Sequence, residues 1–283
     1  MIKKILKVCL VGKTNAGKST FINQVVKEII SISNKKINTT QKLISGIRNF
    51  KNHQFIFFDT PGINFLKTKN IYHSSYKTDL LEGINKSDII FFFIDSKKIN
   101  LNQIKKDLNN IIHLNKKIII LFNKIDLIKQ DDILPYIDKI NNLFKIESFY
   151  PISSKLNIGI DNLLLNLKKF SKKSEWIYKE NEITDKDDIF MTNECTRNSI
   201  LKYLHKEIPY NIKIKNKYFK YLKNGHLKIK QNIIINEIRY KKIILGKKGN
   251  TIKLIRENSQ KDIGKIFNVT THLYIEILKD NAQ

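Results

Sequence analysis

The sequence has few cysteines, few arginines and no long apolar runs, and each shortage excludes a class of protein. Its two cysteines, Cys9 and Cys195, have no CxxC partner, so a disulfide scaffold is excluded. We expect both thiols to be reduced packing residues of a cytosolic protein. The longest apolar runs, such as Ile89–Ile94, are far shorter than the roughly 20 residues that a membrane-spanning helix needs.

The spacing of the histidines argues against a metal site, and the N-terminal residues argue against a signal peptide. The six histidines show no metal-ligand spacing. Residues 1–11 have a basic start and an apolar stretch, but they contain no cleavage site and lead directly into a glycine-rich loop, so we expect a strand rather than a signal peptide. With 283 residues, 41% apolar and 28% charged, the chain is typical of a soluble globular protein with two domains.

The charge is strongly unbalanced. A net charge of +26 favours a polyanionic partner, either nucleic acid or an anionic membrane surface. The basic residues are nearly all lysine, which an A/T-rich coding bias would also enrich. Residues 1–174 carry 30 basic and 13 acidic residues, against 22 and 13 in residues 175–283, so charge alone does not locate a nucleic-acid module.

Residues 8–20, VCLVGKTNAGKST, fit the phosphate-binding pattern G-x-x-x-x-G-K-[ST] between an apolar run and a helix-like segment. The glycines let backbone N–H groups turn inward around phosphate oxygens. Lys18 would reach the terminal phosphates, and the Ser19 hydroxyl would hold Mg²⁺. A glycine-rich turn without ligand is the alternative. The predicted nucleoside-triphosphate loop comprises Gly12, Lys13, Thr14, Asn15, Ala16, Gly17, Lys18, Ser19 and Thr20.

From residue 7 to about residue 170, short β-branched or aromatic runs alternate with amphipathic stretches. Several runs are continuously apolar, which is typical of central strands of a sheet covered on both faces. The pattern predicts a doubly wound α/β fold with its ligand at the carboxyl ends of the strands. The expected strands are 7–11, 43–48, 54–58, 89–94, 118–122 and 149–152, and the expected helices are 19–26, 76–84, 101–114, 135–144 and 160–170.

The motif DTPG ends the third expected strand. Asp59 can hold the shell of a Mg²⁺ ion through water, and the Gly62 N–H can face a γ-phosphate, with Thr60 and Pro61 between them. Upstream, the segment 37–45 contains Thr40, which could complete the Mg²⁺ shell; Thr39 is the less favoured candidate. Such a loop is expected to become ordered with GTP. A threonine-rich hairpin entry is the alternative.

The motifs NKID and SSK follow the fifth and sixth expected strands. The Asp126 carboxylate can accept two hydrogen bonds from the N1–H and N2–H₂ edge of guanine, which adenine lacks. Asn123 and Lys124 would fix and cover the base. A lone NKID is more often a helix cap. Here the phosphate-binding loop, DTPG, NKID and SSK follow one another in this order, which favours GTP over ATP. The backbone at Ser153 and Ser154, followed by Lys155, could contact guanine O6.

After residue 171 the pattern changes. Residues 172–188 are charged and largely non-periodic, and they predict a linker with a single tryptophan. A helix is expected over 189–208, then strands 210–221 and 227–236 around an Asn224–Gly225 turn, and a last strand at 272–278.

The sequence GKKG, residues 246–249, joins two helix-like segments. A GXXG loop in this position is the backbone clamp of a KH domain, which holds single-stranded RNA. A plain helix–glycine turn–helix is the alternative. The residues that we expect to contact RNA are Ile244, Leu245, Gly246, Lys247, Lys248 and Gly249, with the two apolar residues flooring the groove for the bases.

Taken together, ISISNKKINTTQKLISGI, DTPGI, NKID, PISS and the tail with its GXXG loop resemble the Era GTPases from end to end. The resemblance implies a P-loop GTPase domain (1–171), a linker (172–188) and a type II KH domain (189–283). Two positions depart from the family: Gln41 replaces the usual arginine after the threonine pair, and Lys248 replaces a glycine in the usual GKGG loop.

The resemblance also implies a function. Such an enzyme binds GTP and GDP with Mg²⁺, and Asn15 is expected to help bind K⁺, which assists hydrolysis. Because Ile63 stands where Ras-like enzymes have a water-orienting glutamine, catalysis would be slow and rely on Lys18, Gly62, Thr40 and the ions.

By the same resemblance the RNA is the 3′ end of small-subunit (16S) ribosomal RNA, and the task is maturation of the 30S subunit. A monomer in the cytoplasm is implied, with peripheral contact at the inner membrane left open. Two rival functions remain at this stage: a nucleotide-sensing binding module without turnover, and a membrane-surface GTPase.

Overall fold

The computed structural model describes residues 2–27, 30, 43–63, 74–204 and 208–280. By its internal contacts the chain divides into two compact units, Met1–Asp185 and Lys186–Gln283. Within the described ranges no helix combines the length and apolarity needed to cross a bilayer.

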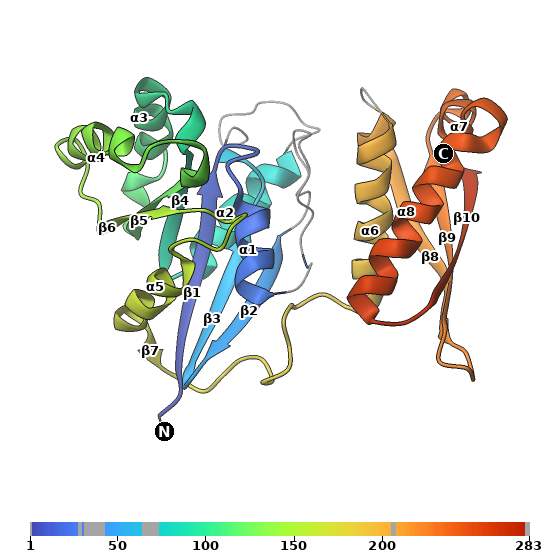
Figure 1. Ribbon diagram of the computed structural model, residues 1–283, viewed down its shortest axis with the longest axis horizontal. Coiled ribbons are helices and arrows are strands. Elements are labelled where there is room, and N and C mark those ends of the chain that lie inside the picture. Colours follow the sequence, from blue (N-terminus) through green and yellow to red (C-terminus); the bar gives the residue numbers. More distant parts are fainter. Residues whose placement is uncertain (1, 28–29, 31–42, 64–73, 205–207, 281–283) are drawn as a thin grey trace. The chain divides into compact units, whose positions relative to one another are not determined.

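The first unit is built on one seven-stranded sheet with helices on both faces (Figure 1). Its central order is β2-β3-β1-β4-β5-β6, with β7 paired to β1. The strands are β1 (Lys4–Gly12), β2 (Ile44–Phe50), β3 (His53–Asp59), β4 (Ile89–Asp95), β5 (Lys117–Asn123), β6 (Ser148–Ile152) and β7 (Lys172–Lys173). The helices are α1 (Lys18–Val26), α2 (Ser74–Lys86), α3 (Leu101–Asn109), α4 (Leu134–Asn141) and α5 (Ile160–Leu167).

The continuously apolar strands form the core, as their sequence predicts. Alternate residues of β1, β4 and β5 pack under α2, α3 and α4, with Phe92 and Phe122 in the middle of this layer. On the opposite face, Phe21 of α1 meets Phe57, Phe91 and Phe93 edge-on, with ring centroids 5.3–6.0 Å apart. Strands buried on both faces leave only their ends free for ligands. The doubly wound α/β prediction is confirmed.

The segment predicted as a linker is mostly part of the first unit. Lys172 and Lys173 pair with β1, and the following residues run along the edge strand β2. We call residues 174–185 the strap. The Ile47 N–H donates to the Ile183 carbonyl (2.8 Å), and the Ser45 N–H donates to the Asp185 carboxylate (2.9 Å).

A buried side chain of the sheet fixes the strap. The Gln54 carbonyl oxygen accepts from the N–H groups of Ile177 and Tyr178, and its amide donates to the Tyr178 carbonyl at 2.9 Å. Trp176 and Tyr178 pack against Ile5, Ile56 and Phe58. The attachment of the strap could not be predicted from the sequence, because hydrogen bonds from a side chain to the backbone produce no periodic pattern of residues. The prediction of a linker over 172–188 is therefore wrong for residues 172–185, which belong to the first unit.

The second unit is a three-stranded sheet, β10-β9-β8, with helices packed against one face (Figure 1). The hairpin turns at Gly225, whose φ of +79° suits glycine. Its elements are α6 (Asp188–Tyr203), β8 (Ile212–Tyr221), β9 (Leu227–Ile235), α7 (Ile238–Leu245), α8 (Asn250–Phe267) and β10 (Thr271–Lys279).

Strict alternation in β9 separates the two faces of this sheet. Ile229, Ile233 and Ile235 are buried against the helices, while the residues between them are more exposed. The first helix, α6, ends at Tyr203 rather than near residue 208 as expected, because Leu204 takes an extended conformation and buries its side chain in the same core. The α+β fold with a GXXG loop between α7 and α8 is as predicted.

Candidate nucleotide site and RNA interface

The topology gathers the sequence motifs at one edge of the large sheet. β1 ends at Gly12, β3 at Asp59, β5 at Asn123 and β6 at Ile152. These four strands are connected through parallel pairings with each other and with β4, so their carboxyl ends meet at the same edge. Four short motifs that are far apart in sequence therefore form one site.

The P-loop, residues 12–20, has a backbone path that only glycine fits at two points. Gly12 and Gly17 have φ angles of +154° and +98°. A Cβ at Gly12 would lie 2.7 Å from the Phe93 carbonyl oxygen, and one at Gly17 would lie 2.0 Å from the Asn123 amide nitrogen. The loop thus packs closely on two neighbouring strands while keeping a curved backbone, which is the form of a phosphate cradle.

Lys18 begins α1 and is almost completely buried. Its ammonium donates to the carbonyl oxygens of Gly12 and Lys13, both at 3.0 Å, and so lies across the loop. Burial lowers the pKa of Lys18 to about 8, although the Asp59 carboxylate acts in the opposite direction. A phosphate group there would replace the lost hydration of this cation.

Ser19 and Asp59 supply the oxygens of a metal site. The Ser19 hydroxyl donates to the Asp59 carboxylate at 2.7 Å, and Asp59 is fully buried. Thr60, also buried, donates to the Leu10 carbonyl at 2.6 Å. A hydroxyl and a carboxylate beside a phosphate loop are hard oxygen ligands of the kind that Mg²⁺ takes, so the residues present fit that ion.

The remaining DTPG residues lie tightly against the P-loop. Pro61 is buried, and a Cβ at Gly62 would lie 2.7 Å from the Thr14 side chain and 3.1 Å from the Thr14 nitrogen. The Gly62 backbone is therefore beside the loop that would hold the phosphates. Thr40 and Thr39 lie outside the described residues, and their predicted roles stay predictions.

Asn123 connects three of the four motifs. Its amide nitrogen donates to the Ala16 carbonyl of the P-loop at 2.8 Å, and its carbonyl oxygen accepts from the Ser154 N–H at 2.9 Å. The side chain is 1% exposed, so these two bonds lie in the protein interior and are expensive to break. The base-binding segments are thus bonded directly to the phosphate loop.

Asp126 is oriented from the neighbouring strand end. The Ser153 hydroxyl donates to its carboxylate at 2.6 Å and accepts from the Leu156 N–H at 3.1 Å. The Ser154 hydroxyl is buried and has no hydrogen-bond partner among the described residues. Lys155 is exposed. A carboxylate that is held in place by a hydrogen bond is suited to accept from the two N–H donors of guanine.

Lys124 shows a partner that the sequence reasoning missed. Its ammonium donates to the Asn15 carbonyl at 2.8 Å and to the Asp95 carboxylate at 2.6 Å. Both Asn15 and Lys124 adopt positive φ, 64° and 67°. Asp95 is the last residue of β4 and pairs in register with Asn123, so an acidic residue ending a buried strand next to the NKID strand was the available signal.

The two cysteines are packing residues, as the sequence predicts. Cys9 and Cys195 are buried free thiols, and burial raises the pKa of each above its usual range. Within the described ranges there is also no cluster of three or more His, Cys, Asp or Glu side chains that could hold a metal ion.

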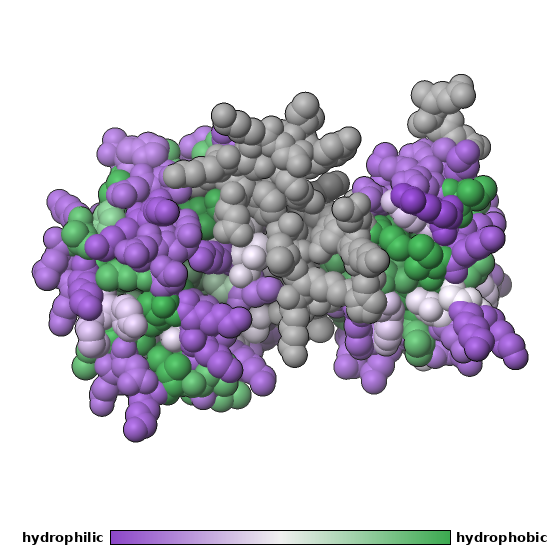
Figure 2. Space-filling view, turned by 90° about the horizontal axis from the view of Figure 1, so that it is seen from above, coloured by the Kyte–Doolittle hydropathy of each residue, from purple (hydrophilic) through white to green (hydrophobic). Residues whose placement is uncertain are grey.

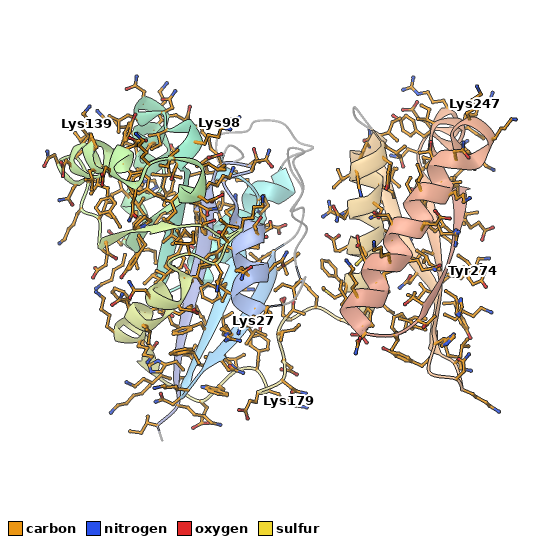
Figure 3. All side chains as sticks on the ribbon, viewed as in Figure 1. Lys27, Lys98, Lys139, Lys179, Lys247 and Tyr274 are labelled. Atoms are coloured by element: carbon orange, nitrogen blue, oxygen red, sulfur yellow. The ribbon has the colours of Figure 1, made fainter. Side chains whose placement is uncertain are left out.

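The GKKG loop has the geometry of a backbone clamp. Gly246 has φ +71°, and a Cβ there would lie 2.1 Å from the Thr251 hydroxyl. Lys248 and Gly249 also have positive φ, and a Cβ at Gly249 would meet nothing within 4 Å. Gly246 thus closes the loop on α8, while Gly249 at the start of α8 leaves open space above the backbone. Lys247, labelled in Figure 3, projects from this loop.

The prediction that Ile244 lines the RNA groove is wrong. Ile244 is fully buried beside Tyr240, because the two lie one helical turn apart on the core face of α7. It cannot floor a groove. Leu245 is 37% exposed, and Ile243 of α7 and Leu254 of α8 are each 47% exposed. Figure 2 shows apolar side chains gathered on this unit and bordered by hydrophilic ones.

Comparison with known proteins agrees with this geometry. Residues 7–124 match the family model of the 50S ribosome-binding GTPase, and residues 207–283 match that of the KH domain. GTPase Era of Rickettsia prowazekii (strain Madrid E) is 34% identical over 278 residues, covering 97% of this chain and 92% of the relative. GTPase Era of Ehrlichia ruminantium (strain Gardel) is 32% identical, covering 96% and 92%.

Two solved structures have the same fold over nearly the whole chain. One is Era in complex with MgGDPNP and nucleotides 1506–1542 of 16S ribosomal RNA, with a TM-score of 0.87, 29% identity and coverage of 98% of this chain and 94% of that one. The other is an Aquifex aeolicus Era variant bound to GDP.AlF4-, also with a TM-score of 0.87 and 29% identity, covering 98% and 95%. With the P-loop, the guanine-recognition motifs and the GXXG loop all in place, this chain is a GTPase that belongs to the GTPase Era family.

Proposed function

We propose that the chain is a GTP-hydrolysing switch that captures the 3′ end of 16S ribosomal RNA and assists maturation of the 30S ribosomal subunit. Hydrolysis of GTP to GDP and phosphate would time the release of that RNA. The GTPase unit would report the nucleotide state, and the KH unit would hold the RNA by its GKKG loop.

The observation that carries this proposal is the presence of both sites in one chain. The nucleotide site is completed by hydrogen bonds between its motifs, through Asn123 and Lys124. The clamp keeps both defining glycines, and Gly249 leaves its backbone open to a sugar–phosphate chain. A relative that covers 98% of this chain has been solved with ligands of both kinds. A module that only senses nucleotide would not need the clamp.

Within the nucleotide site, each group has a distinct task. Lys18 and the P-loop N–H groups would bind the terminal phosphates, and Ser19 with Asp59 would hold Mg²⁺, which neutralises the charge that develops on them. Asp126 would select guanine, while Lys124 covers the base. We infer that Thr40 completes the metal shell.

Base selection can be tested with Asp126→Asn. The amide cannot accept both guanine N–H groups, and each charge-assisted bond contributes about 1.5–3 kcal/mol, so affinity for GTP should fall by more than tenfold. Affinity for xanthosine triphosphate should rise, because the amide can donate to its extra oxygen. Titration calorimetry with both nucleotides measures the exchange.

The matched control for this change is Asp131→Asn, which removes the same charge from an exposed residue on a nearby turn. The control should bind GTP like the unaltered protein. Equal GTP affinity in Asp126→Asn and in the control would refute the assignment of Asp126 to the base.

We also propose that K⁺ assists hydrolysis next to Asn15. Asn15 lies in the P-loop at a positive φ, and Ile63, which is buried, offers no group to orient water. Replacing K⁺ with Na⁺ at constant ionic strength should slow phosphate release and leave the affinity for GTP unchanged. If the two salts give the same rate, another positive group acts in place of the ion.

The clamp can be tested with Gly249→Asp, measured by fluorescence anisotropy on a labelled RNA of about 8 nucleotides taken from the 16S 3′-terminal sequence, which is long enough for the GXXG loop alone. The aspartate would place a side chain and a negative charge on the path of the phosphates. Binding should be lost at protein concentrations that saturate the unaltered chain, while GTP binding stays intact.

Gly225 provides the control for this variant. It has φ +79° against +76° at Gly249, and a Cβ there also meets nothing within 4 Å. Gly225→Asp therefore adds the same charge and the same backbone strain to the same unit, and it should retain RNA binding within a few-fold. If both variants bind equally, the GKKG loop is not the clamp.

We place the protein in the cytoplasm as a monomer, where its RNA is found. The net charge of +26 is the observation that favours an additional, peripheral contact with the anionic face of the inner membrane. Such a contact would be electrostatic and would be lost as salt rises.

A further inference from the structure

The small sheet of the KH unit has a second face that the helices do not cover. The core side chains of β9, such as Ile229 and Ile233, all point to α6, α7 and α8. Because side chains alternate along a strand, the residues between them point the other way. We call this opposite side the outer face. Its residues are Lys213, Lys215, Tyr218 and Lys220 of β8, Lys228, Lys230, Asn232 and Ile234 of β9, and His272, Tyr274, Glu276 and Leu278 of β10.

The outer face is strongly basic. Its carboxylate, Glu276, is paired with Lys230 at 2.9 Å, and this hydrogen bond holds the pKa of Glu276 below its usual range. At one end Lys213 lies 3.6 Å from Asp280. Lys215, Lys220 and Lys228 have no carboxylate partner among the described residues. These cations remain available to a polyanion.

Two aromatic rings share a row with one of the lysines. In the strand register, Tyr218 of β8 lies opposite Lys230, and Lys230 lies opposite Tyr274 of β10. The backbones that carry the two tyrosines are therefore two strand spacings, about 10 Å, apart. Tyr218 is 41% exposed and Tyr274 is 53% exposed. Figure 3 labels Tyr274 on β10.

The irregularity of β8 is what brings Tyr218 into this row. The ladder shifts between Asn216, which pairs with Gln231, and Tyr218, which pairs with Lys230. The extra residue at Lys217 moves the following side chains to the other face. Without it, Tyr218 would point into the core and Phe219 would point out. Lys228 completes the group, with its ammonium 5.7 Å from the Tyr274 ring centroid.

We propose that the outer face is a second binding site for single-stranded RNA, separate from the GKKG clamp. Bases would stack on Tyr218 and Tyr274, and the unpaired lysines would contact the phosphates. Exposed rings on a sheet, surrounded by cations, are the combination with which proteins hold single strands without strong sequence preference. The site goes beyond the clamp of the proposed function and does not depend on the nucleotide state.

A single strand fits this surface better than a lipid bilayer does. An anionic membrane would use the lysines and would also take tyrosine rings at its headgroup level, but it has no flat base to stack on each ring. The contact with RNA uses both the charges and the rings. The membrane is therefore the competing outcome of the test.

The test uses the full chain and two oligonucleotides without secondary structure. A GXXG loop clamps about four nucleotides, so an RNA of about 8 nucleotides should occupy the clamp alone, whereas one of about 24 nucleotides can reach both surfaces. The double variant Tyr218→Ala with Tyr274→Ala should lower the affinity for the long RNA by at least tenfold and leave the affinity for the short RNA unchanged. Replacement of both rings by Phe should restore binding, because stacking does not need the hydroxyl.

The contribution of the lysines to RNA binding is tested with two triple variants, one on the outer face and one control. Lys215→Ala with Lys220→Ala and Lys228→Ala should flatten the salt dependence for the long RNA by about 2 in slope, as expected for three phosphate contacts on a single strand. The control removes three exposed lysines from the first unit, Lys106, Lys139 and Lys145, and should leave the slope unchanged.

Two results would overturn the proposal. One is a double alanine variant that binds the long RNA as tightly as the unaltered chain. The other is a triple lysine variant that loses binding to phosphatidylserine vesicles but keeps its RNA affinity.

Ultraviolet crosslinking of the unaltered chain adds a measurement that needs no variant: the long RNA should attach at Tyr218 or Tyr274. Gly249→Asp should lose the short RNA and keep measurable binding of the long one, so that a failure of the clamp is distinguishable from a failure of the outer face.

Discussion

The amide of Asn123 is the interaction on which the nucleotide site depends. It lies at the end of β5 and bonds the P-loop on one side and the Ser153–Ser154 turn on the other. A Cβ at Gly17 would lie 2.0 Å from its nitrogen, so this position of the Asn123 side chain requires a glycine in the loop. Lys124 adds a second connection through Asn15. Phosphate binding and guanine recognition are therefore parts of one hydrogen-bonded unit.

Most of the fold and site could be predicted because their signals are local. The continuous apolar runs of β1, β4 and β5 indicate buried parallel strands, and each motif follows such a run by a residue or two. The proposed roles of Asp126 and Lys18 follow from their chemistry and spacing. The family resemblance rested on the same residues, and the match over 97% of the chain to a relative at 34% identity confirms it.

What could not be predicted depends on tertiary contacts. Asp95 is one acidic residue after an apolar strand, and only the register of β4 with β5 reveals its bond to Lys124. The strap has no periodicity because Gln54, more than a hundred residues earlier, satisfies its backbone. Ile244 was assigned to the RNA groove by its closeness in sequence to the loop, whereas the helical turn from Tyr240 places it in the core. The bulge at Lys217, which sets the outer face, likewise has no clear sequence signal.

The two halves of the chain use lysine differently. The GTPase unit is the more basic by count, yet the features suited to RNA are in the KH unit, where glycine gives close backbone approach and tyrosine accompanies lysine in register. Geometry rather than net charge is therefore the basis on which we propose the RNA surfaces.

The central claim is that Asn123 joins base recognition to phosphate binding. The most direct measurement is the affinity of Asn123→Ala for ribose 5′-triphosphate, which lacks a base, in the presence of Mg²⁺. If the amide holds the P-loop, the variant should bind this ligand more weakly than the unaltered chain does, even though no base is present to be recognised. Equal affinity in the two proteins would contradict the account, because Asn123 would then serve the base alone.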